Sequence, residues 1–197
     1  MIDRSKLKPG QIFIVMNDPL KFNVIDEGIS WFEWGMSKST ESDHVGMIYG
    51  NEEIAEQYWP KSRKMPVSHY DATFDAGLLV IMHPKEWTPE YAARTQAYWD
   101  TNIGKLYGAL DDIPRFAFDG LIWRLWPGLG KWLKKRDISD IDTCRTTVCS
   151  QELALAVEYG FNAPNYIKAK TGIGRGREVP GDYLTMSCFE VSQRIVK

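Results

Sequence analysis

A histidine and a cysteine, far apart in the sequence, stand in the local contexts that thiol chemistry requires. Cys149 begins a helical pattern that continues through Glu152 and Leu153, and His44 opens the apolar run Val45–Tyr49. A thiol in a first helical turn lies beside free backbone N–H groups and the positive end of the helix dipole, which stabilise a thiolate and the oxyanion of a tetrahedral intermediate. An imidazole that meets it can take up a proton and return it. We therefore interpret Cys149 as a nucleophile and His44 as its base.

The residue that orients the imidazole is expected on the strand that returns after the turn at Gly50. A two-residue turn places Gln57 opposite His44, whereas a three-residue loop or a bulge brings Glu56 to the side of the histidine. Strand alternation also puts Gly46 on the face of His44, where the missing side chain leaves room for a chain segment or a substrate. The pattern leaves these choices open.

The other cysteines and histidines lack these contexts. Cys144 and Cys188 do not begin a comparable helix, and neither His69 nor His83 precedes a small residue in such a strand. An odd number of cysteines without zinc-ligand spacing favours free thiols in a reducing compartment. We expect these four side chains to be structural, and we expect no metal and no cofactor.

The elements that must position the pair mix strands and helices without regular alternation, which predicts an α+β fold. Thr88 is expected to cap a helix that has Pro89 at its first position and ends before Gly104, and Gly160 is expected as a left-handed C-cap of the cysteine helix. The expected strands are Gln11–Met16, Val45–Tyr49, Ile54–Trp59 and Gly77–Met82, and the expected helices are Leu20–Lys38, 88–102 and Cys149–Tyr159.

A tryptophan-rich segment at 112–136 has apolar residues at helical spacing, which Pro127, Gly128 and Gly130 are expected to interrupt, and it closes with lysines and an arginine. Three interpretations stay open: helices packed on the domain, a lid over a cleft, or an interfacial helix that touches lipid through residues 116–136. A second basic group, at Lys61, Arg63 and Lys64, is expected in a solvated loop.

Size and charge limit the classes of function. The chain has 197 residues, of which 44% are hydrophobic and 25% charged, and this suits one domain, 1–197, with a helical insertion at about 112–142. A net charge of −2 gives no indication of nucleic acid as a partner. We see no signal peptide and no membrane span, so we expect a cytoplasmic protein of unknown oligomeric state.

The histidine hairpin, 43–51 followed by Ile54–Gln57, resembles that of NlpC-type cell-wall amidases. The later position of Cys149–Leu153 resembles their circularly permuted papain-like relatives of the YiiX/YaeF type. Further pieces fit in order along most of the chain: Pro9-Gly10, Gly104–Tyr107 and Pro180–Leu184. Asp43 departs from the family, in which serine is common before the histidine, and segment 112–142 matches no family motif.

This resemblance implies a permuted papain-like α+β fold, with an antiparallel sheet packed against helices. It implies that Glu56 is the third catalytic residue, and that Tyr107 lies near the nucleophile as an oxyanion or substrate ligand, with Gln57 and Gly46 as further substrate-binding candidates. The expected activity is hydrolysis of an amide, in a peptide or a peptidoglycan-type isopeptide, through an acyl-enzyme. The alternatives are an acyltransferase or thioesterase for acyl-lipid substrates, and a catalytically inactive binding module.

Overall fold

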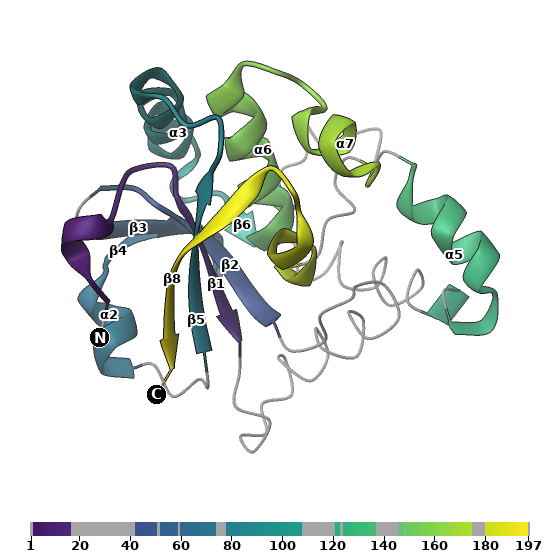
Figure 1. Ribbon diagram of the computed structural model, residues 1–197, viewed down its shortest axis with the longest axis horizontal. Coiled ribbons are helices and arrows are strands. Elements are labelled where there is room, and N and C mark those ends of the chain that lie inside the picture. The colour runs from purple at the N-terminus through teal and green to yellow at the C-terminus, as the bar shows by residue number, and fades with distance from the viewer. Residues whose placement is uncertain are drawn as a thin grey trace.

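The computed structural model describes residues 2–16, 42–50, 52–58, 60–73, 78–107, 121–122, 124–136, 146–147, 149–174 and 180–196. Its centre is a six-stranded antiparallel sheet in the order β4-β3-β2-β1-β5-β8 (Figure 1). These strands are β1 (Ile12–Met16), β2 (Ser42–Ile48), β3 (Glu53–Glu56), β4 (Arg63–Pro66), β5 (Leu78–Pro84) and β8 (Phe189–Val196). Two short strands, β6 (Leu106–Tyr107) and β7 (Thr146–Thr147), pair in parallel beside it.

Helices cover both faces of this sheet, and the predicted α+β class is confirmed. The helices are η1 (Arg4–Lys6), α2 (Ser68–Thr73), α3 (Pro89–Asn102), α5 (Pro127–Lys134), α6 (Cys149–Phe161), α7 (Tyr166–Thr171) and η2 (Pro180–Thr185). Alternate residues of β1 divide the core. Ile12 and Ile14 pack with α6, whereas Phe13 and Val15 pack on the opposite face with Val67 and neighbouring side chains.

Helix α3 begins and ends as its sequence predicts. The Thr88 side chain accepts a hydrogen bond from the Tyr91 backbone N–H (3.1 Å), and Pro89 occupies the first turn, where its missing N–H costs nothing. After the C-cap at Ile103, Gly104 adopts a φ of 91°, a left-handed conformation that favours glycine. The helix expected at Leu20–Lys38 lies outside the described residues.

Helix α6 begins at Cys149, as predicted, but Gly160 does not end it. Gly160 lies inside the helix, where a Cβ atom would stand 2.5 Å from Thr95 Cγ2 and 2.6 Å from Tyr91 Cε2 of α3. The glycine is therefore needed for close helix packing, and the left-handed residue is Asn162, with a φ of 51°. This packing holds the cysteine helix firmly against α3.

The helical pattern is interrupted before Pro127, as predicted, but Gly128 and Gly130 do not interrupt it. Pro127 begins α5 and the two glycines lie within it. The break lies at Trp126, whose φ of −139° and ψ of 78° are not helical, although its N–H donates to the Ile122 oxygen (2.7 Å) and its oxygen accepts from the Gly130 N–H (2.9 Å). No helix among the described residues has the length and apolar character needed to cross a bilayer.

Candidate active site

The register of the β2–β3 hairpin decides which residue faces the histidine. Ile48 pairs with Ile54, and the Tyr49 N–H donates to the Glu53 oxygen (2.9 Å), so the strands are joined by the three-residue loop 50–52. By alternation this register places Glu56 on the face of His44, which is the longer-loop alternative described above.

Both carboxylate oxygens of Glu56 form hydrogen bonds with neighbouring side chains, one of which is His44. His44 Nε2 lies 2.9 Å from Oε2, the Tyr70 hydroxyl donates to the same oxygen (2.6 Å), and Arg63 Nε donates to Oε1 (2.7 Å). The side chain of Glu56 is 0% exposed. Burial alone would raise its pKa, but the hydrogen bond and charge of His44, with those of Tyr70 and Arg63, outweigh it and lower the pKa to about 2.

The imidazole connects this carboxylate to the cysteine. Because His44 Nε2 faces Glu56, Nδ1 is the ring nitrogen left for the hydrogen bond with the Cys149 thiol. Burial alone would lower the pKa of His44, but the hydrogen bonds and charges of Cys149 and Glu56 raise it to about 10. His44 is therefore an imidazolium at neutral pH.

Cys149 occupies the first position of α6, where backbone N–H groups have no acceptor within the helix. The residue is 3% exposed, and the side chain of His44 is 15% exposed. The Tyr183 hydroxyl donates to the Ser150 oxygen (2.8 Å) and ties η2 to the start of the helix.

The backbone of Tyr107 lies beside the residues that come just before Cys149. In the β6–β7 pair it stands opposite Thr147, just before Cys149 in the chain. Its side chain lies outside the described residues, so its expected role as an oxyanion ligand stays a prediction.

Gly46 and Gln57 both contact other segments of the protein. A Cβ atom at Gly46 would stand 2.5 Å from the Phe13 ring, so the Phe13 side chain occupies the space beside this glycine, and the expected part of Gly46 in substrate binding stays a prediction. Gln57 is buried, and its Nε2 donates to the backbone oxygens of Lys105 (3.3 Å) and Leu106 (2.8 Å). The glutamine thereby holds the start of β6 near the site.

A second buried carboxylate, Glu152, lies one turn after the nucleophile. It pairs with Lys105 Nζ (3.0 Å) and accepts a hydrogen bond from the Tyr98 hydroxyl (2.7 Å). The side chain of Lys105 is 15% exposed and that of Glu152 is 0% exposed. This ion pair joins α3, α6 and the segment that leads into β6.

The expectation of a solvated basic loop at 61–64 is wrong for two of its three residues. Arg63 lies in β4 and bonds Glu56, because β4 pairs with β3 and Arg63 stands directly opposite Glu56. Lys64 pairs with Asp100 and covers the Tyr49 ring at 3.7 Å, whereas Lys61 is exposed. Sequence reasoning missed Arg63 and also missed Tyr70, the hydroxyl donor from α2.

The remaining cysteines and histidines show no comparable arrangement. Cys188 is buried in the core, and burial raises the pKa of its thiol. Burial lowers the pKa of His83. Cys144 lies outside the described residues. In the described part of the chain, no three His, Cys, Asp or Glu side chains converge as ligands for a metal ion.

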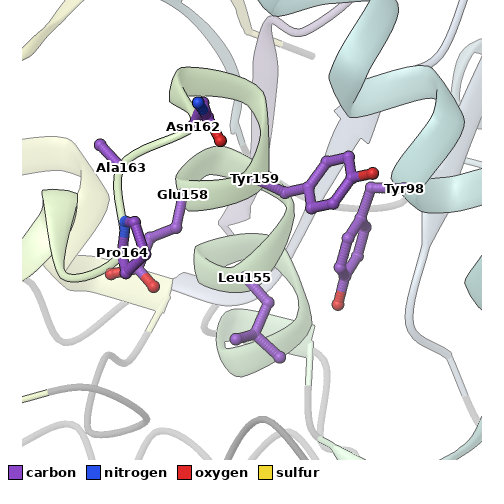
Figure 2. A pocket seen from close by; sticks show the side chains of 7 residues that line it. All are labelled: Tyr98, Leu155, Glu158, Tyr159, Asn162, Ala163 and Pro164. Carbon is purple, nitrogen blue, oxygen red and sulfur yellow. The ribbon is translucent and has the colours of Figure 1, made fainter.

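A pocket of about 220 Å³ lies between α3 and the second half of α6 (Figure 2). Figure 2 shows its lining side chains, which are Tyr98, Leu155, Glu158, Tyr159, Asn162, Ala163 and Pro164. Its lining on α6 begins at Leu155, roughly 9 Å along the helix axis from Cys149 at about 1.5 Å per residue, and Cys149 itself is not part of the lining.

Comparison with known proteins gives a likeness of fold. No family model matches the sequence, and no curated protein matches it. A similar solved structure is that of the metalloprotein YiiX from Escherichia coli O157:H7, with a TM-score of 0.59 and 11% identity over 98% of this chain and 99% of that chain. The expected YiiX-like fold is thereby confirmed.

Proposed function

We propose that the protein is a thiol hydrolase that cleaves an amide bond with Cys149 as nucleophile, His44 as proton carrier and Glu56 as the group that orients the imidazole. One observation carries this proposal: a continuous chain of contacts runs from a thiol at a helix start, through an imidazolium, to a fully buried carboxylate. Such a chain is the arrangement that activates a cysteine nucleophile.

In the proposed reaction the Cys149 thiolate adds to the substrate carbonyl, and backbone N–H groups at the start of α6 bind the oxyanion. The His44 imidazolium gives its proton to the departing amine nitrogen as the C–N bond breaks, which leaves a thioester and a neutral imidazole. The imidazole then takes a proton from water, whose oxygen attacks the thioester. Breakdown releases the acid and restores the thiolate and the imidazolium, so one water is consumed for each amide cleaved.

The proposed substrate is a peptide or a peptidoglycan fragment with an isopeptide bond. This choice depends on the resemblance of the histidine hairpin to those of cell-wall amidases. We propose a cytoplasmic, reducing setting, because the two cysteines in the described residues, Cys149 and Cys188, are free thiols.

The test is the rate of iodoacetamide alkylation at each cysteine, followed by peptide mass spectrometry from pH 5 to 10. An ordinary thiol with a pKa of about 8.5 is roughly 1% thiolate at pH 6.5. We expect Cys149 to react at least tenfold faster than Cys188 at pH 6.5, and this advantage to disappear in His44→Ala. Equal rates for the two cysteines in the folded protein, with full reaction of both in urea, would refute the proposal and favour an inactive binding module.

A second candidate keeps the nucleophile and changes the substrate to an acyl-lipid, as in an acyltransferase or a thioesterase. The observation that favours it is a group of exposed apolar side chains on α5 and just before it, which includes Leu125, Leu129 and Trp132. Incubation with a fatty acyl thioester and with a peptidoglycan digest separates the two candidates. The mass added to Cys149 identifies the acyl group that is transferred.

A further inference from the structure

Large apolar side chains are exposed along α5 and the residues before it. Their exposed fractions are 44% for Leu121, 57% for Leu125, 59% for Trp126, 45% for Leu129 and 50% for Trp132. Leu129 and Trp132 are three residues apart and lie on one side of α5, and Leu125 lies just before the helix. Leu125, Trp126, Pro127, Gly128 and Leu129 surround an open hollow of about 540 Å³. This apolar face has no partner among the described residues of the core.

The opposite side of the same segment is the one that packs on the protein. Gly130, on the side of α5 opposite Trp132, is buried, and Ile122, before the helix, is also buried. Lys134 Nζ lies 2.7 Å from Asp182 Oδ1, with both side chains largely buried, and the Gly174 N–H donates to the Lys134 oxygen (2.7 Å). Helix α5 is thus held by its inner side at one end of the molecule, away from the sheet (Figure 1).

The charge of this segment is opposite to that of the whole protein. Residues 121–136 contain five lysines and arginines and no aspartate or glutamate, whereas the net charge of the chain is −2. Lys131 and Lys135 are exposed, and the Arg136 guanidinium lies 4.2 Å from the centre of the Trp132 ring. The basic groups therefore border the apolar face.

We propose that α5 is a membrane-docking surface that lies flat on an anionic lipid bilayer. Tryptophan and leucine suit the boundary between headgroups and acyl chains, and lysine and arginine beside them suit anionic headgroups. A protein partner fits less well, because the cores of protein interfaces are depleted in lysine. The inference does not depend on the proposed chemistry of Cys149, since a catalytically inactive protein would dock in the same way.

The test is sedimentation of the full chain with vesicles of phosphatidylcholine alone and of phosphatidylcholine with 30% phosphatidylserine. We expect binding to the anionic vesicles, weakened at least tenfold by 1 M salt because screening removes the headgroup attraction. The double variant Trp126→Ser/Trp132→Ser is expected to lose at least tenfold in partitioning. Lys131→Glu/Lys135→Glu is expected to do the same for anionic vesicles only.

Tyr159→Ser supplies the matched control. Tyr159 is an aromatic residue with a similar exposed fraction, 54%, on α6. We expect this variant to bind as the wild type does. Three outcomes would overturn the inference: no sedimentation with anionic vesicles, equal losses in all variants, or concentration-dependent dimers that the α5 variants abolish while lipid binding is absent.

Discussion

Glu56→Gln is the most direct test of the buried network. The substitution keeps the shape of the side chain and removes its charge, while the His44 imidazolium, the Arg63 guanidinium and the Tyr70 hydroxyl still point at it. An amide has one accepting oxygen, so its NH₂ group must face a former donor. Both cations lose their counterion, and at least one of them also loses its hydrogen-bond acceptor, in a site with little solvent.

The size of the effect follows from the pKa of Glu56. Folding lowers this pKa from its ordinary 4.5 to about 2. At about 1.4 kcal/mol per pH unit, the ionised carboxylate contributes about 3 kcal/mol to the free energy of unfolding above pH 5. This agrees with the roughly 3–5 kcal/mol lost when one member of a buried ion pair is removed. Because the folded pKa is depressed, the contribution is fully present above pH 4.5 and is lost as the pH falls through 2.

The assay is urea unfolding of wild type and Glu56→Gln between pH 3 and 7. We expect the variant to be about 3 kcal/mol less stable at pH 7, and the difference to fall to less than half at pH 3. Titration of the His44 imidazole by NMR should show its pKa fall from about 10 toward the ordinary range.

Glu152→Gln is the matched control, because Glu152 is an equally buried carboxylate whose cation is Lys105 and not His44. We expect a similar loss of stability with no change in the pKa of His44. A difference below 1 kcal/mol at pH 7 for Glu56→Gln, or one that does not depend on pH, would refute the reasoning.

Three further predictions concern substitutions of Tyr70, of two glycines and of His44. Tyr70→Phe removes one donor to Glu56 and should cost about 1.5–3 kcal/mol in urea unfolding, without loss of the imidazolium in an NMR titration. Gly160→Ala should cost about 1–3 kcal/mol by overpacking, whereas Gly128→Ala, whose Cβ meets nothing within 4 Å, should leave the melting temperature unchanged or raise it. The stability advantage of wild type over His44→Ala should be full below pH 6.5 and disappear as the pH rises through about 10, because folding raises the pKa of His44.

The sequence predicted the parts of the site that depend on local pattern. Cys149 begins a helix because the apolar period begins there, and the hairpin follows from two apolar runs around Gly50. The choice between Glu56 and Gln57 could not be made from the residues alone, because it depends on the length of the loop that closes the hairpin, and both lengths fit the same sequence. The resemblance to a family indicated Glu56, and the observed register agrees.

The missed features depend on contacts between distant segments. In the sequence Arg63 cannot be distinguished from an ordinary surface residue, because only the pairing of β4 with β3 brings it to Glu56. No local pattern indicates that the Tyr70 hydroxyl donates to the same carboxylate. Gly160 was misread because glycine near a helix end also serves as a C-cap, and only the approach of α3 distinguishes the two uses. Gly128 and Gly130 were misread as interruptions, since both lie within α5, whereas Pro127 was rightly read as one, because the pattern breaks at Trp126 and a new helix begins at the proline.

The order of the pieces along the chain has a consequence for biosynthesis. His44 and Glu56 leave the ribosome first, and Cys149 follows about a hundred residues later. At a rate of synthesis of about 5–20 residues per second, Cys149 is added roughly 5–20 seconds after His44. The proposed pair of Cys149 and His44 therefore cannot form until most of the polypeptide has been made.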